Sequence, residues 1–147
     1  MNILFEEARL GVMQFTLFEA RALRSIDPMG QQDPYVQLSL GKDYIKRSKS
    51  IKNGGTKPYY AEEEMLIWVD AKNWIHNLFI DIYDEEIGSS KQIASTSLSL
   101  LKYCNSAIVQ DQTEETFQLY YKKQLDPKDK LSLKDVPQGE LIMRVSC

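Results

Sequence analysis

Residues 27–33 read DPMGQQD and run directly into residues 34–40, which read PYVQLSL. The first stretch is rich in turn-forming residues and has an aspartate at each end. The second alternates apolar and polar side chains, as a half-buried strand does. Together they predict a loop that carries two carboxylates and leads into a sheet. Carboxylates on such a loop suit a hard cation, because Ca²⁺ takes about 6–8 oxygen ligands. The alternative is that the two aspartates only shape the turn.

Short alternating or apolar segments recur at near-regular spacing along the rest of the chain. Turn clusters at 53–58, 87–90 and 126–129 separate several of them. About eight strands with little helix predict an all-β fold, an eight-stranded antiparallel β-sandwich. The predicted strands lie near residues 13–17, 34–40, 45–51, 65–69, 78–84, 93–98, 116–120 and 140–145, with one short helical turn near 98–103.

The chain has 147 residues, which is the size of one ordinary domain. We therefore expect a single, monomeric domain over residues 1–147, with its core between about 11 and 145. Residues 122–138 are rich in charge, and we interpret them as a charged loop inserted before the last strand.

Composition excludes some classes of protein. Eighteen basic and 21 acidic residues give a net charge of −3, which disfavours a nucleic-acid binder. Cys104 and Cys147 are too few for a disulfide framework, which favours a reducing compartment. The first ten residues do not resemble a secretory leader, and no run approaches about 18 apolar residues. We expect a cytoplasmic protein that meets membranes only at their surface.

Several motifs follow one another in a definite order along the chain. Residues 15–23, FTLFEARAL, and 33–36, DPYV, resemble the opening of the C2 domain family. Residues 56–63 resemble its "NPxWNExF" segment, residues 78–84 its "LxIxVxD" strand, and residues 139–141 its closing "GEL" strand. The resemblance implies a Greek-key sandwich of eight antiparallel strands with three loops at one end. The closing strand suggests the type II strand order.

The resemblance also implies a calcium site built from acids of the first and third loops. Four positions match the family's ligands: Asp27, Asp33, Asp84 and Glu86. The fifth position falls on Lys91 if the third loop is short and on Gln92 if it is not. Either residue removes a negative charge, so calcium binding should be weak or limited to one ion. The alternative is a vestigial loop held by hydrogen bonds and a contact from Lys91.

A basic stretch follows the second predicted strand. Lys42 and Asp43 lie at its start, and the six basic residues less one acid give a local charge of +5. Each lysine or arginine near an anionic leaflet contributes about 1 kcal/mol. The position is similar to that of the family's lysine-rich phosphoinositide patch, although lysines also protect exposed edge strands. The candidate lipid-binding residues are Lys46, Arg47, Lys49, Lys52 and Lys57, with Met29 and Ile87 as apolar loop residues that would enter the bilayer.

No catalytic apparatus is recognisable, since His76 is the only histidine and no nucleophile has a base beside it in sequence. We therefore expect a binding protein rather than an enzyme. The leading hypothesis is a peripheral C2 domain that docks on anionic phospholipid or phosphoinositide with weak calcium dependence. The alternative is a calcium-independent module that binds another protein.

Overall fold

The computed structural model describes residues 11–27, 31–41, 44–69, 77–103, 114–124, 126, 128 and 133–146. These residues form antiparallel strands and one short helix, which confirms the all-β prediction. The elements are β1 (Gly11–Arg21), β2 (Pro34–Leu40), β3 (Tyr44–Arg47), β4 (Tyr59–Val69), β5 (Asn77–Glu86), β6 (Ser89–Ser99), α2 (Leu100–Tyr103), β7 (Glu115–Gln124) and β8 (Leu133–Ser146).

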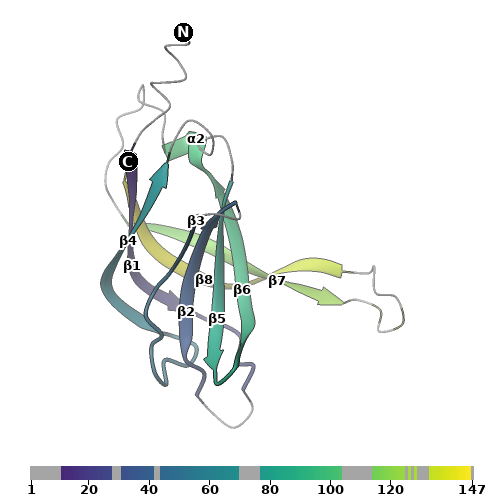
Figure 1. Cartoon of the computed structure of the whole chain (residues 1–147). Coiled ribbons are helices and arrows are strands. Elements are labelled where there is room, and N and C mark those ends of the chain that lie inside the picture. Colours follow the sequence, from purple (N-terminus) through teal and green to yellow (C-terminus); the bar gives the residue numbers. More distant parts are fainter. Residues whose placement is uncertain are drawn as a thin grey trace.

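The strands follow the order β3-β2-β5-β6-β7-β8-β1-β4, and the arrangement folds into two layers (Figure 1). Among the described residues, β6 and β7 share a single register pair, Ser95 with Tyr120, so the layers separate there. One layer is β3-β2-β5-β6 and the other is β7-β8-β1-β4. The last strand, β8, lies between β7 and β1, in keeping with the type II order suggested by the sequence.

Alternation along the strands places one side of each layer in the core. Val36, Leu38 and Leu40 of β2 are all buried, as the pattern of residues 34–40 predicts. They belong to one core cluster with buried side chains of the other layer such as Phe15 and Leu17 of β1. Removing this apolar surface from water is the main stabilising term, at about 25 cal/mol per Å².

Three connections meet at one end of the sandwich. The links β1–β2, β3–β4 and β5–β6 lie at the lower end of Figure 1, while α2 lies at the upper end. Backbone hydrogen bonds join two of these links to each other, for example from Leu23 N to Thr56 O at 3.2 Å. We call this region the loop end.

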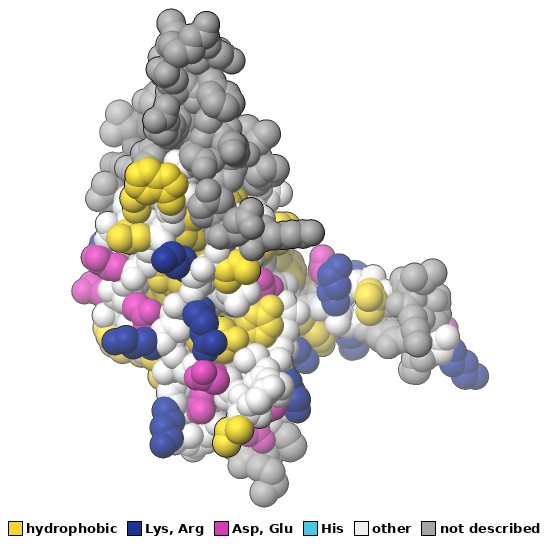
Figure 2. All heavy atoms as spheres, viewed as in Figure 1, with side chains coloured by type: hydrophobic (Ala, Val, Ile, Leu, Met, Phe, Trp, Pro, Cys, Tyr) yellow, Lys and Arg dark blue, Asp and Glu magenta, His cyan; other side chains and the backbone are white. Residues whose placement is uncertain are grey.

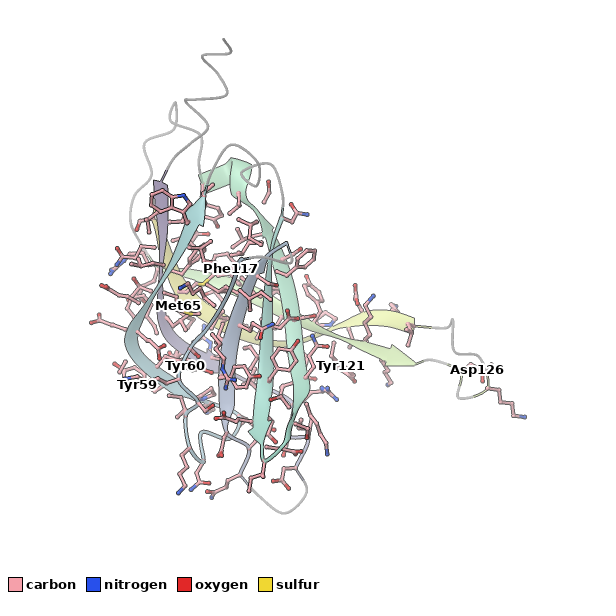
Figure 3. All side chains as sticks on the ribbon, viewed as in Figure 1. Tyr59, Tyr60, Met65, Phe117, Tyr121 and Asp126 are labelled. Atoms are coloured by element: carbon pink, nitrogen blue, oxygen red, sulfur yellow. The ribbon has the colours of Figure 1, made fainter. Side chains whose placement is uncertain are left out.

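A two-stranded ribbon projects from the side of the sandwich (Figure 1). Strands β7 and β8 remain paired from Tyr121 with Val136 to Gln124 with Leu133. We call the paired residues 121–124 and 133–136 the ribbon; Tyr121 lies at its base and Asp126 at its far end (Figure 3). We expected a loop over residues 122–138, whereas the described part of this stretch is mostly strand. Ladder hydrogen bonds satisfy the backbone without an apolar face, so the hydrophobic pattern did not reveal these strands.

Candidate functional site at the loop end

Gln32 connects the β1–β2 link to its neighbours, and only 1% of its surface is exposed. Its side-chain Nε2 donates to Arg24 O at 2.7 Å and to Gly55 O at 2.9 Å. Its Oε1 accepts a hydrogen bond from Ile26 N at 3.1 Å. A buried amide satisfied on both sides fixes the path of the chain, because each lost partner would leave a desolvated polar group.

The acids at the end of the first loop and the end of β5 are joined by backbone groups. Asp33 N donates to Asp84 Oδ1 at 2.8 Å, and Glu85 N donates to Asp33 O at 3.0 Å. Asp33 Oδ1 in turn accepts from Asn53 N at 2.8 Å. The pairing of Pro34 with Asp84 across β2 and β5 produces this juxtaposition. The structure thus brings Asp33 and Asp84 together.

Asp84 is buried, with 3% of its surface exposed. Burial raises the pKa of the Asp84 carboxyl, and the hydrogen bond from Asp33 N opposes that rise. The charges of Glu86, Asp33 and Asp27 raise the same pKa further. Negative charge is therefore in excess around this carboxyl, and a bound cation would relieve it.

The third loop is a tight turn of two residues, Ile87 and Gly88, between β5 and β6. Glu86 pairs with Ser89 across it, and Asp84 pairs with Lys91. This corresponds to the short-loop alternative, with Lys91 opposite the first acid. Lys91 Nζ lies 3.7 Å from Glu86 Oε1, so the lysine neutralises part of Glu86. The other candidate, Gln92, donates through Nε2 to Asp81 Oδ1 at 2.7 Å.

These acids fit a hard cation by donor type, since carboxylate oxygens around a buried aspartate with like charges near it are what Ca²⁺ prefers. Their side chains are not gathered into a metal site: within the described part of the chain, no three acidic, histidine or cysteine side chains are grouped closely enough to hold a metal. One oxygen of Asp33 and one of Asp84 already accept backbone hydrogen bonds.

Arg47, one of the predicted lipid-binding residues, is engaged within the protein. Its Nη2 lies 2.9 Å from Glu85 Oε1, and its guanidinium lies 3.9 Å from the centre of the Tyr35 ring. Ser50 also donates to Glu85. The Ser50 hydrogen bond and then Arg47 lower the pKa of the Glu85 carboxyl. Much of the Arg47 charge is therefore compensated before any ligand arrives.

The neighbouring lysines are arranged differently. The side chains of Lys46, Lys49, Lys52 and Lys57 are exposed, and none of them belongs to an ion pair of the described residues. Ile87, at the tip of the β5–β6 turn, is fully exposed. The loop end thus combines an exposed apolar tip with nearby lysines that have no acidic partner in the described structure. Met29 and Lys42 fall outside the described residues.

The fold matches a known protein family. The C2 domain pattern matches residues 11–121. The chain belongs to the C2 domain family. C2 domains are typically non-catalytic binding modules, which agrees with the class of protein predicted from the sequence.

Three known proteins illustrate what this C2 domain is similar to. Synaptotagmin-2 of Arabidopsis thaliana is 26% identical over 141 residues, which cover 92% of this chain and 24% of that protein. The chain spans about a quarter of the length of the curated relatives it matches. A C2 domain of plant extended synaptotagmin 1 superposes with a TM-score of 0.68 at 21% identity, covering 94% of each chain. A calcium-bound structure of two C2 domains of extended synaptotagmin 2 gives 0.62 at 20% identity, covering 92% of this chain and 45% of that one.

Two residues that hold the loop end of this C2 domain together, Gln32 and Arg24, were not predicted from the sequence. Gln32 carried no signal beyond its place in a turn. Arg24 donates from Nε to Ile93 O at 3.0 Å and from Nη2 to Gln92 O at 3.1 Å, and it lies 4.3 Å from the centre of the Tyr121 ring. Its acceptors are backbone carbonyls 68 and 69 residues away, so no local pattern could have identified them.

Among the described residues, no helix has both the length and the apolar character needed to span a bilayer.

Proposed function

We propose that this C2 domain docks peripherally on anionic phospholipid through its loop end, with Ile87 entering the interface and nearby lysines contacting head groups. The observation that carries the proposal is the complete exposure of Ile87 at the tip of a tight turn. An isoleucine gains nothing from such a position in water, whereas an interface would bury it.

The lysines of the β3–β4 region supply the electrostatic part of the proposed contact. Lys49, Lys52 and Lys57 lie in the β3–β4 link and are exposed. Each contributes about 1 kcal/mol near an anionic leaflet. Arg47 contributes less than its charge indicates, because Glu85 already pairs with it.

Calcium has a subsidiary role in the proposal. Asp33 and Asp84 would provide the central oxygens, with Asp27 and Glu86 at the periphery, and the ion would supply positive charge where acids otherwise repel the membrane. Binding would be weak, because Lys91 competes for Glu86 and one oxygen of each central aspartate is already hydrogen-bonded.

The test is sedimentation with vesicles of phosphatidylserine and phosphatidylcholine, at low and high salt, with calcium or with a chelator. We expect binding that falls as salt rises, since exposed charges are screened beyond about 10 Å at 0.1 M ionic strength. Ile87→Ser should weaken binding, whereas Leu66→Ser, at an exposed apolar residue of β4 away from the loop end, serves as the control. Absence of binding to every anionic vesicle would refute the proposal.

The calcium component has its own test. Calorimetric titration and thermal melts should show a stabilisation by calcium that is lost in the double variant Asp27→Asn, Asp84→Asn, because a ligand that binds only the folded state raises its stability by mass action. A flat response up to millimolar calcium would remove calcium from the mechanism and leave the lysines and Ile87 as the lipid contact.

A second candidate function, calcium-independent binding of another protein, is favoured by one observation. Val12 pairs with Trp68 across β1 and β4, and both side chains are exposed together with that of Leu66. These residues form an apolar strip on the outer side of the second layer, away from the loop end. A chain that fails to bind vesicles would direct attention to this strip.

A further inference from the structure

We propose that the ribbon formed by β7 and β8 is a second cationic contact, which lies against the same anionic lipid surface as the loop end. The inference rests on the proposed membrane function and extends it to a part of the chain remote from the loops. Three register pairs continue beyond Tyr121 and Val136, so the ribbon reaches about 10 Å further from the sandwich.

Side-chain packing does not explain why the ribbon projects from the sandwich. Lys122 and Lys123 of β7 and Lys134 and Asp135 of β8 are all exposed, and Leu133 exposes 52% of its surface. A two-stranded ribbon without an apolar face is at best marginally stable in water. Strands that protrude without burying their own side chains are well placed to contact another surface.

Charge on the ribbon is predominantly positive. Its described residues and tip carry four lysines, at 122, 123, 128 and 134, against Asp126 and Asp135, giving +2 in a chain whose net charge is −3. None of the ion pairs among the described residues involves Lys122, Lys123 or Lys134. The charges of these three lysines are therefore available to an external anion.

One pair on the ribbon specifically favours an external anion. Lys123 lies directly opposite Lys134 in the ladder, and like charges in that position destabilise a pair of strands. An anion between or below the two ammonium groups would remove the repulsion. Lysines that only protect an exposed edge do not need to be paired with each other.

A lipid surface suits this arrangement better than an acidic peptide does. Figure 2 shows dark-blue side chains both on the body and on the ribbon, and a lipid surface is broad enough to extend over two separate regions of one protein. Leu133 adds an exposed apolar side chain at the end of the ribbon, on the opposite face from Lys134, and an apolar side chain there can reach the interface between head groups and acyl chains. A short acidic peptide could contact only one of the two regions.

The experiment compares two triple variants of the full chain that remove the same charge. The ribbon variant carries Lys122→Gln, Lys123→Gln and Lys134→Gln; the loop-end variant carries Lys49→Gln, Lys52→Gln and Lys57→Gln. With vesicles of phosphatidylserine and phosphatidylcholine, we expect each variant to bind about a hundredfold more weakly than the unmodified chain, because three lysines at about 1 kcal/mol each are removed. Circular dichroism and thermal melts verify that both remain folded.

The outcomes separate the two proposals. If the loop-end variant loses affinity and the ribbon variant does not, the ribbon inference is wrong while the proposed function stands. If the unmodified chain binds no anionic vesicle, both are wrong. If the ribbon variant instead loses binding to a protein partner and keeps vesicle binding, the ribbon contacts protein and the lipid inference is overturned.

A labelling experiment tests contact directly. A polarity-sensitive fluorophore is attached at Leu133→Cys or, as a control of nearly equal exposure, at Leu66→Cys, where 51% of the native residue is exposed; Cys104 and Cys147 are replaced by serine in both. We expect vesicles to shift the emission of the label at position 133 to shorter wavelength by more than that at 66. An unchanged label at 133 on vesicle-bound protein would contradict the inference.

Discussion

At the loop end, charged and polar side chains of one segment are bound by the backbone of another, whereas in the ribbon the lysines extend into solvent from a ladder held by backbone hydrogen bonds. Asp33 accepts from Asn53 N, Asp84 accepts from Asp33 N, and Gln32 bonds to two links at once. The acids and the Gln32 amide of the loop end are therefore structural, whereas the lysines of the ribbon, like the exposed lysines of the β3–β4 link, remain available for binding.

Removing the buried amide of Gln32 should destabilise the protein more than any other change considered below. Gln32→Leu leaves Ile26 N and the carbonyls of Arg24 and Gly55 without that partner. We expect a loss of about 4 kcal/mol in the free energy of unfolding, measured in urea, because buried polar groups without partners cost about 1–3 kcal/mol each. Gln31→Leu, at the exposed neighbour, should change stability by less than about 0.5 kcal/mol. Equal effects of the two variants would contradict the role of Gln32.

The junction between the ribbon and the sandwich should be the next most sensitive point. Gly139 has φ of +83°, and a Cβ there would lie 2.8 Å from Ala22 O and 2.9 Å from Arg21 O. Gly139→Ala should cost about 3 kcal/mol, from left-handed strain and the close contact together. Gly41→Ala, at φ of +72° with no atom within 4 Å, should cost about 1 kcal/mol from strain alone. Urea titrations of both variants separate contact from strain.

The charge of Asp84 should have a smaller effect on the stability of the fold. The folded-state pKa of Asp84 is raised, so the contribution of this group to stability is fully present below its unfolded pKa and is lost as pH rises through its folded pKa. Asp84→Asn keeps an oxygen acceptor for Asp33 N and removes the charge. In chelator, we expect the variant to be more stable than the unmodified chain at neutral pH, with a difference that shrinks as the pH falls through the pKa of Asp84.

The control for this prediction lies in the ribbon. Asp135→Asn removes an exposed carboxylate opposite Lys122, and it should bring no gain in stability at neutral pH. A gain in both variants would indicate a general effect of net charge rather than local crowding around Asp84.

The smallest expected effect concerns the lysine pair of the ribbon. Lys123→Glu places an acid opposite Lys134 and should stabilise the fold by about 0.5 kcal/mol. Lys122→Glu places an acid opposite Asp135 and should destabilise it by a similar amount. Thermal melts measure both. The two variants change the net charge identically. If they shift stability in opposite directions and lose vesicle binding equally, the loss of binding comes from lipid contact and not from a change in the stability of the ribbon.

Much of the fold could be predicted from local patterns. The alternation of residues 34–40 predicted a half-buried strand, and Val36, Leu38 and Leu40 are buried. The ordered motifs from residue 15 to residue 141 predicted the family. The strands of the ribbon were not predicted, because they bury no face and therefore show no hydrophobic period.

The candidate site was predictable only as a set of residues. The resemblance predicted that Asp33 and Asp84 lie close together, with a lysine near them. It did not indicate that Lys91 pairs with Glu86, or that Glu85 holds Arg47, since these partners depend on the two-residue turn and on the approach of β3 to the end of β5.

The sequence by itself determined the all-β class, the family and the identity of the charged residues, because strand periodicity and turn chemistry are properties of neighbouring residues. Only the tertiary structure decided which charges are satisfied inside the protein and which remain exposed. Electrostatic pairing depends on distances between segments that are far apart in the chain, and folding alone brings Asn53 to Asp33, Glu85 to Arg47 and Lys123 to Lys134.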